Sequence, residues 1–364
     1  MKIDDIYQEL ADRLNLYPIG VPKTKELIEI LKNRWEPEEA SIGIKLPTVL
    51  EEFSAIAEHY DLDEKELKAK LEKLTNKGLV FHSEKGGKSH YCLLPSIWGF
   101  FQTSFWKGEK NNFTTKLAPL WDEYYYKDFS KELFGSKTPL GRIIPIEKSV
   151  ITTSPEIAPY EKISEIIKSR SLIAVGHCPC RMLRKLEDRG CNHSLETCLH
   201  YGDWAEYMIK RGFGREVSKD EALNIIKKTE EEGLIHIVEN HQDGKGDISA
   251  TCCCCSCCCV MLRGILELKN VASTVLGPSN FLMKIDKKSC TGCGTCVDRC
   301  LFNAVRLDND TARVDHDLCM GCGLCESTCT GAAVTLKRRD QIDSLPLPDL
   351  ETLMVKIMKE KGRI

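Results

Sequence analysis

The first third of the chain repeats apolar residues at the spacing of amphipathic helices. Between residues 24 and 78, Leu and Ile recur every three or four positions with Lys and Glu between them, which predicts helices. Three stretches carry this pattern: TKELIEILKNRW (24–35), LPTVLEEFSAIAEHY (46–60) and LDEKELKAKLEKLTNKG (62–78). Asp63 and Glu66 are placed to cap the start of the third helix, and Gly78 marks its end.

A hairpin is predicted directly after these helices. LVFHSE (79–84) and SHYCLL (89–94) lie on either side of KGGK, a pattern typical of two strands joined by a tight turn. Three helices followed by a hairpin predict a winged-helix-like domain over residues 1–95. We interpret Cys92 as a buried strand residue of that domain.

The pattern changes after residue 95. SIWGFFQTSFW (96–106) and LWDEYYYKDF (120–129) concentrate aromatic residues, which we interpret as core rather than as the lining of a cofactor or partner groove. Prolines recur in the residues that follow, so we expect 96–160 to be a connector between domains.

The helical pattern returns further along the chain. Ser218 and Glu221 form a capping box before a helical stretch that ends at Gly233, and LIHIVEN (234–240) predicts a strand. We expect 161–281 to be a mainly helical, cysteine-rich domain and 341–364 a helical tail. The expected fold class is α+β with several domains.

The composition and charge of the chain limit the classes of function that it can have. Of the 364 residues, 42% are hydrophobic and 29% charged, which is typical of a folded domain protein. MKIDDIYQEL has no secretory h-region and no stretch approaches the apolar length of a membrane span, so we expect a cytoplasmic protein without membrane insertion. Residues 1–95 hold 14 Lys and Arg against 18 Asp and Glu, a net charge of −4. DNA phosphates would be repelled, so we expect no DNA binding.

The chain has 20 cysteines, and all except Cys92 lie between Cys178 and Cys329. Disulfides are rare in the cytosol, so this clustering indicates metal ligation or redox chemistry. Two runs, CTGCGTCVDRC and CMGCGLCESTC, share the spacing C-x2-C-x2-C-x3-C, in which the fourth cysteine of each run crosses to the other cluster. The expected ligand sets are Cys290, Cys293, Cys296 and Cys329 for the first cluster, and Cys319, Cys322, Cys325 and Cys300 for the second.

This spacing favours iron–sulfur clusters over zinc, whose four-cysteine sites usually pair two distant C-x2–4-C hairpins. Residues 282–340 resemble a bacterial-type ferredoxin with two [4Fe–4S] clusters. Leu301 and Thr330 stand where such runs usually have proline, but that proline is not a ligand. We therefore expect two [4Fe–4S] clusters in this domain.

Eleven further cysteines precede the ferredoxin-like runs. They are Cys178, Cys180, Cys191 and Cys198, and the strip CCCCSCCC with Cys252, Cys253, Cys254, Cys255, Cys257, Cys258 and Cys259. Soft thiolates select iron–sulfur clusters, zinc or cuprous copper. We expect Cys178 and Cys180 to share one side of an extended segment, with the strip completing their site, binding a second cluster or supplying a dithiol. Eleven is not a multiple of four, so a scheme of cubanes alone leaves some cysteines over.

One arginine and three histidines flank these cysteines in the sequence. Arg181 is either a solvated helix residue or a positive charge beside a cluster, where it would raise the reduction potential. We interpret His177, His193 and His200 as packing residues or neighbours of ligands rather than as ligands.

From APYEKISEIIKSRSLIAVGHCPCR through the strip to the ferredoxin-like tail, the chain resembles a family of 4Fe-4S ferredoxin-type iron–sulfur proteins of anaerobic bacteria and archaea. The strip of that family typically reads C-N-C-C-x-C-C-C, so Cys253 is the member least expected to be a ligand. The resemblance implies electron transfer in anaerobic metabolism and supplies no substrate.

We therefore expect electrons to pass between the two ferredoxin-type clusters and at least one further Fe–S centre in the middle domain. The expected partner is a redox protein or an oxidoreductase subunit, and the chain itself is either an oxidoreductase or the electron-transfer part of one. The N-terminal domain is a candidate for homodimerisation. Two alternatives remain open: an Fe–S-sensing winged-helix transcriptional regulator, and a thiolate metal-handling protein.

Overall fold

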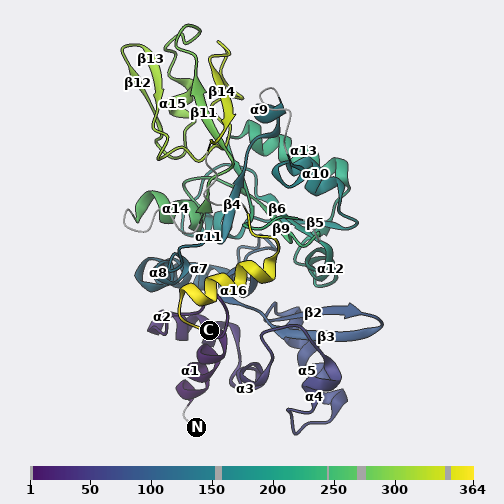
Figure 1. The fold of residues 1–364 in the computed structure, drawn as a ribbon. Helices are drawn as coiled ribbons and strands as arrows, with labels where there is room; N and C mark the ends of the chain where they lie inside the picture. The colour runs from purple at the N-terminus through teal and green to yellow at the C-terminus, as the bar shows by residue number, and fades with distance from the viewer. Residues whose placement is uncertain (1–2, 152–157, 244–245, 269–275, 341–345) are drawn as a thin grey trace.

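The structure is a computed structural model that describes residues 3–151, 158–243, 246–268, 276–340 and 346–364. Figure 1 shows an elongated arrangement, with the N-terminal helices at one end, a sheet in the middle and the last hairpins at the other end. All twenty cysteines lie within the described residues.

Helices and one small sheet form the N-terminal region. The helices are α1 (Ile3–Leu14), α2 (Lys25–Arg34), α3 (Pro37–Lys45), α4 (Phe53–Ala57) and α5 (Glu64–Asn76). The strands β1 (Glu51–Glu52), β2 (Val80–Lys85) and β3 (Lys88–Leu93) pair in the order β1-β3-β2. Asp63 caps α5 by accepting from the amides of Lys65 and Glu66 at 2.9 and 3.2 Å, and Gly78 beyond the helix has φ +71°.

The expected helix over 46–60 is wrong in extent. Only Phe53–Ala57 is helical, while Leu46 ends α3 in an extended conformation and Glu51 pairs with Tyr91. The reason is Pro47, because a residue that precedes proline is driven out of the helical region. The helices α1 and α3 were not among those expected. The assignment of 1–95 as a winged-helix-like domain stays a prediction.

Aromatic residues after β3 fill the core, as expected. The elements here are the irregular turn η1 (Ser96–Phe100), α6 (Phe101–Thr103), α7 (Asn112–Tyr124), the π-turn η2 (Tyr125–Phe129), α8 (Ser130–Leu133), β4 (Gly141–Ile144) and α9 (Glu147–Ile151). Phe100, Trp106, Trp121 and Tyr124 are almost completely buried. Trp98 has φ +55° and contributes instead to a cavity described below.

A seven-stranded sheet organises the middle of the described chain. Its strands are β5 (Ile173–His177), β6 (Glu196–Tyr201), β7 (Arg215–Glu216), β8 (Ile235–Glu239), β9 (Ala250–Cys254), β10 (Leu276–Gly277) and β4, in the order β10-β4-β8-β9-β6-β5-β7. Only the pair β10–β4 is parallel among these. The accompanying helices are η3 (Pro159–Glu161), α10 (Ile163–Lys168), α11 (Pro179–Leu186), α12 (Gly202–Lys210), α13 (Lys219–Glu231) and α14 (Val260–Glu267).

A sheet at the centre of the middle region was not expected, although helices account for more of residues 161–281 than strands do. Strand β4 is buried at every position, and its sequence GRII shows no alternation of apolar and polar residues that would have indicated a strand. Strand β4 also comes from the expected connector and pairs with β8, with Ile144 opposite His236. The predicted start of α13 at Ser218 and the strand 234–240 are confirmed, since Ser218 Oγ accepts from the Glu221 amide and β8 spans Ile235–Glu239. The Glu221 carboxylate accepts from Arg215 at 2.7 Å, and only the Ser218 half of the predicted capping box is seen.

Two antiparallel strand pairs form the C-terminal region. They are β11 (Phe281–Ile285) with β14 (Val334–Arg338) and β12 (Val305–Asp308) with β13 (Thr311–Val314), and the short helix α15 (Thr295–Asp298) lies between them in sequence. The last helix, α16 (Leu350–Glu360), turns back toward the N-terminal region (Figure 1). Lys361 and Arg363 both pair with Glu132 at 2.7 Å.

Candidate metal centres

The first ferredoxin-like cavity is lined by Cys290, Cys293, Cys296 and Cys329. These are the four residues that the crossed spacing assigns to one cluster. Gly292 has φ +69°, and a Cβ there would lie 2.4 Å from the carbonyl oxygen of Asp310, so only glycine allows the loop this close approach. The amide of Ala312 donates to Cys290 Sγ at 3.4 Å, and Cys293 is exposed to solvent.

The second cavity is lined by Cys300, Cys319, Cys322 and Cys325. Its loop is equally tight, because a Cβ on Gly321 would lie 2.1 Å from the Phe281 carbonyl oxygen. The amide of Ala304 donates to Cys300 Sγ at 3.3 Å. Burial raises the pKa of Cys322 to about 12, so this thiol stays protonated unless a metal displaces the proton.

These two cavities fit [4Fe–4S] clusters by the chemistry of their donors. Each offers four thiols, a glycine-containing loop that leaves space at the cavity wall, and a backbone amide directed at a ligand sulfur. The fourth cysteine of each sequence run lies with the first three of the other run. The structure therefore brings together all eight cysteines in the two groups expected from spacing.

A third cavity lies in the middle of the chain, between the sheet and the aromatic core. Its volume is about 50 Å³, compared with about 20 Å³ for each ferredoxin-like cavity. Eight cysteines contribute to its wall: Cys253 and Cys255, which are described below, and six that are here called the six-thiol ring, Cys178, Cys180, Cys198, Cys252, Cys254 and Cys259. They come from three places: the start of α11, the middle of β6, and the strip in β9 and before α14.

Local structure explains how this ring is assembled. Cys198 and Cys252 are directly paired across β6 and β9, and Cys254 is two residues further along β9 on the same face. Cys178 caps α11, and Pro179 occupies the first position of the helix, where no amide is needed. The expected extended geometry of Cys178 and Cys180 is therefore wrong, although both side chains still reach the same cavity.

The six thiols line one cavity and shift one another's pKa values. Three have their pKa lowered because each accepts a hydrogen bond from a neighbouring thiol: Cys178, Cys252 and Cys259. Three have their pKa raised because each donates to such a neighbour: Cys180, Cys198 and Cys254. Lowered and raised thiols alternate around the ring, and a thiophilic metal that binds here has to displace the protons of the thiols with a raised pKa.

A separate group of four cysteines lies on the other side of the strip. Cys191, Cys255, Cys257 and Cys258 hold their sulfur atoms within 4.8 Å of one another. This four-thiol group shares no member with the six-thiol ring, although Cys255 also contributes to the wall of the ring cavity. The sulfur–sulfur distances are 3.8 Å for Cys191–Cys255 and 3.7 Å for Cys191–Cys258 and Cys257–Cys258. Cys253, the remaining strip cysteine, points to the opposite face of β9 from Cys252 and Cys254 and is buried near Thr229.

Arg181 is completely buried rather than solvated. Its guanidinium donates to the carbonyl oxygens of Ser194 and Cys253 and to Thr197 Oγ1, and it lies 3.8 Å from Cys255 Sγ. Arg181 also lines the ring cavity, so its positive charge lies beside both cysteine groups. Among the histidines, His200 lies with its Nε2 3.3 Å from Cys198 Sγ, and burial lowers its pKa to about 3, so it is neutral.

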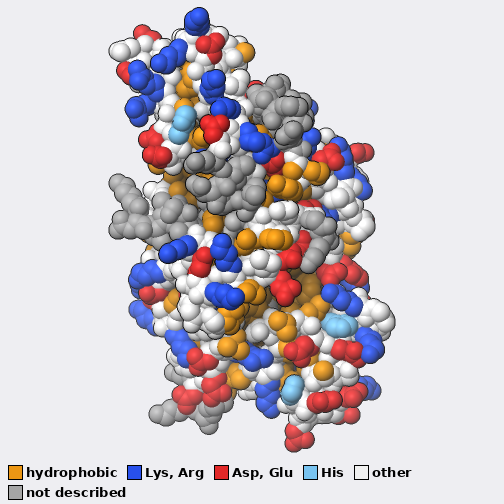
Figure 2. Space-filling model, in the orientation of Figure 1, with side chains coloured by type: hydrophobic (Ala, Val, Ile, Leu, Met, Phe, Trp, Pro, Cys, Tyr) orange, Lys and Arg blue, Asp and Glu red, His pale blue; other side chains and the backbone are white. Residues whose placement is uncertain are grey.

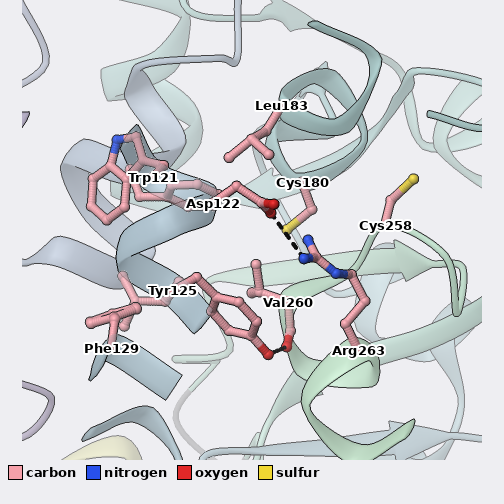
Figure 3. Close-up of a pocket in the computed structure, with 11 residues that line it drawn as sticks. Trp121, Asp122, Tyr125, Phe129, Cys180, Leu183, Cys258, Val260 and Arg263 are labelled. Carbon is pink, nitrogen blue, oxygen red and sulfur yellow. Dashed lines mark hydrogen bonds and ion pairs between the residues drawn. The ribbon is translucent and has the colours of Figure 1, made fainter. Parts of the chain in front are cut away.

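An acidic residue that sequence reasoning missed connects the cysteine-bearing segments. Asp122 of α7 is buried and accepts from Arg263 at 2.9 Å, Arg184 at 3.2 Å and Arg189 at 2.8 Å. Figure 3 shows the Asp122–Arg263 pair beside Cys180 and Cys258, one from each cysteine group. The sequence signal that could have identified Asp122 as buried is its helical spacing, since it follows Ala118 by four residues on the apolar face of α7.

Comparison with known proteins supports the C-terminal assignment. Residues 282–330 match the family model described as a 4Fe-4S dicluster domain. No curated protein and no solved structure gives a significant match to the chain. None of the helices within the described residues has both the length and the apolar character to cross a membrane. The chain is therefore an iron–sulfur protein with a ferredoxin-like domain that binds at least one [4Fe–4S] cluster, and it carries a further group of clustered cysteines.

Proposed function

We propose that the protein is an electron-transfer protein in which two [4Fe–4S] clusters of the ferredoxin-like domain connect an external redox partner with a third Fe–S centre in the six-thiol ring. When bound, such clusters supply one-electron carriers. The eight ferredoxin-like cysteines would hold the first two, and the ring cysteines the third. This function matches the electron-transfer role that the sequence pattern predicts.

The position of the second cavity carries this proposal. The carbonyl oxygen of Cys322 accepts from the Ile146 amide at 2.9 Å, and that of Gly323 accepts from Ser149 Oγ at 3.0 Å. Ile146 follows β4, β4 pairs with β8, and Ile235 of β8 pairs with Cys254 of the ring. A path of covalent and hydrogen bonds therefore runs from Cys322 in the second cavity through two strands to Cys254 of the ring.

The first cavity is suited to meet the partner. Cys293 is exposed, whereas Cys322 in the second cavity is only partly accessible. A redox protein or oxidoreductase subunit that docks beside Cys293 would reach the first cluster without contacting the middle region. The direction of flow depends on that partner.

The ring would provide the inner end of the path. Six thiols exceed the four ligands that one cubane requires, so two thiols remain for a larger cluster or for a reactive dithiol. The buried charge of Arg181 would raise the reduction potential of an anionic centre here. The ring is thus either a third relay or a site of reduction, and the second role would make the chain an oxidoreductase.

The N-terminal domain supports an interaction role instead of DNA recognition. Its hairpin packs on α12, with Phe81 4.6 Å from Trp204 between ring centroids and Ser83 donating to Asp203 at 3.2 Å. Arg211 pairs with Glu72 of α5 at 2.6 Å. Figure 2 shows acidic and basic side chains mixed along this face of the molecule, without a basic stripe.

Iron and sulfide analysis with EPR spectroscopy tests the proposal. Protein purified without oxygen should contain about twelve or more iron atoms per chain, of which about eight belong to the ferredoxin-like domain. Cys252→Ala should remove one EPR signal and leave the two ferredoxin-type signals unchanged. A parent protein with about eight iron atoms and only two signals would refute the third centre.

A further inference from the structure

The four-thiol group has a geometry that differs from that of a cluster site. Three of its sulfur–sulfur distances are 3.7–3.8 Å, and all four sulfurs lie within 4.8 Å of one another. These contacts are far longer than the roughly 2.05 Å of a disulfide bond. The four thiols thus face a common point without being bonded to one another.

A single metal ion accounts for these distances. Zinc binds thiolates at about 2.3 Å in a tetrahedron, and the edge of such a tetrahedron is about 3.8 Å. A cubane would not fit, because each thiolate then binds a different iron at a separate corner, with four irons and four sulfides between the ligands. Sulfurs that approach one another this closely leave space for one ion only.

Two segments of the chain supply the four ligands for that ion. Cys255, Cys257 and Cys258 belong to one tight turn between β9 and α14, and Cys191 comes from the loop after α11. Arg181 lies 3.8 Å from Cys255 Sγ and partly neutralises the charge of −2 that four thiolates and a divalent ion would carry. Cys257 is exposed, which gives the ion a route from solvent.

We propose that Cys191, Cys255, Cys257 and Cys258 bind a single divalent transition-metal ion in tetrahedral four-thiolate coordination, separate from every iron–sulfur cluster. Zinc is the expected ion because it binds such sites more tightly than ferrous iron in the Irving–Williams order. This site divides the eleven middle cysteines into four for one ion, six for the ring, and Cys253 as a buried packing residue.

The ion would also hold the ring in place. Cys254 and Cys259 of the ring lie immediately before and after the turn that carries three of the ion's ligands. Fixing this turn to the Cys191 loop positions both ring cysteines from the opposite side of the strip. The role is a structural clamp, in which the ion orders ligands for a neighbouring centre.

Metal analysis of the full-length protein tests the site independently of the proposed electron transfer. Cys257→Ala removes the exposed ligand and is the variant least disruptive to folding, and Cys253→Ala is a matched control from the same strip. Parent and control should contain one zinc per chain, with four sulfur neighbours at about 2.3 Å by zinc X-ray absorption spectroscopy. Cys257→Ala should lose that zinc, or bind it at least tenfold more weakly, with iron and sulfide content retained.

The other outcomes are equally informative. If Cys257→Ala loses one iron and no sulfide, the single-ion site stands and its occupant is mononuclear iron. If it loses about four irons together with sulfide while zinc is absent from the parent, the group holds a cluster and the proposal is wrong. If parent and variant have the same metal content, the group is not a metal site, whether or not the ring binds its own centre.

Discussion

Replacing Asp122 by alanine should loosen both cysteine groups of the middle region at once. The carboxylate accepts hydrogen bonds from three arginines: Arg263 of α14, the helix after the strip, Arg184 of α11, and Arg189, two residues before Cys191. Three cysteine-bearing segments are therefore held to α7 by one side chain. Its loss leaves positive charges without their buried partner.

The expected loss of unfolding free energy follows from the burial of Asp122 and Arg263. Arg263 is 1% exposed and Asp122 5% exposed, and removing one member of a buried ion pair costs about 3–5 kcal/mol. Arg263 keeps a hydrogen bond to Tyr126 Oη at 3.2 Å, and Arg189 is half exposed, so we expect the lower end, about 3 kcal/mol. Asp128→Ala is a matched control, because its exposed pair with Lys131 should contribute less than about 1 kcal/mol.

Urea unfolding followed by circular dichroism, with the protein kept free of oxygen, measures this difference. Asp122→Ala should also lose middle-region metal faster than the control when challenged with a chelator. The double variant Asp122→Leu with Arg263→Met should recover much of the stability, because a buried ion pair can be replaced by apolar packing at little cost. If Asp122→Ala is as stable as Asp128→Ala and retains its metal equally well, the anchoring role is wrong.

Three further predictions concern other parts of the chain. Cys300→Ser should damage the cluster held by Cys319, Cys322 and Cys325 and leave the other ferredoxin-type EPR signal intact; loss of the signal from the Cys290 cluster instead would exclude crossed ligation. Burial lowers the pKa of His236 to about 4, so the unfolded chain takes up a proton first as the pH falls below about 6.5, and stability is lost toward pH 4. Between pH 6.5 and 5 the parent should lose about 1.6 kcal/mol relative to His236→Gln in urea unfolding, and parallel curves would contradict this. Fluorescence anisotropy with duplex DNA at physiological salt should show no sub-micromolar binding by this acidic N-terminal domain, and sequence-dependent binding would favour the regulator.

Sequence reasoning found the ferredoxin-like cavities because their ligand spacing is local. Three cysteines within seven residues reach one cavity because the loop itself brings them together, whatever the rest of the chain does. Glycines such as Gly292 mark these tight loops. Strand alternation likewise separates Cys253 from Cys252 and Cys254 once β9 is recognised.

The division of the remaining cysteines could not be predicted in this way. Whether Cys191 joins Cys258 or Cys180 depends on how β6 pairs with β9 and on the turn between β9 and α14. The sheet as a whole gave a weak signal, because a strand such as β4 is buried at every position and its sequence lacks alternation. Asp122 acts only through arginines that are 62 to 141 residues away in sequence.

Electron transfer from the ferredoxin-like domain to the ring tests the central claim most directly. A reduced donor protein too large to enter the middle cavity is mixed with the oxidised parent or with Cys300→Ser, and the EPR signal of the ring centre is followed by rapid freeze-quenching. The account predicts that the ring centre of the parent is reduced through the ferredoxin-like clusters, and that loss of the second cluster slows this reduction at least tenfold while the ring keeps its iron. Equal rates in the two proteins would show that electrons reach the ring without the ferredoxin-like domain, and the proposed path would be wrong.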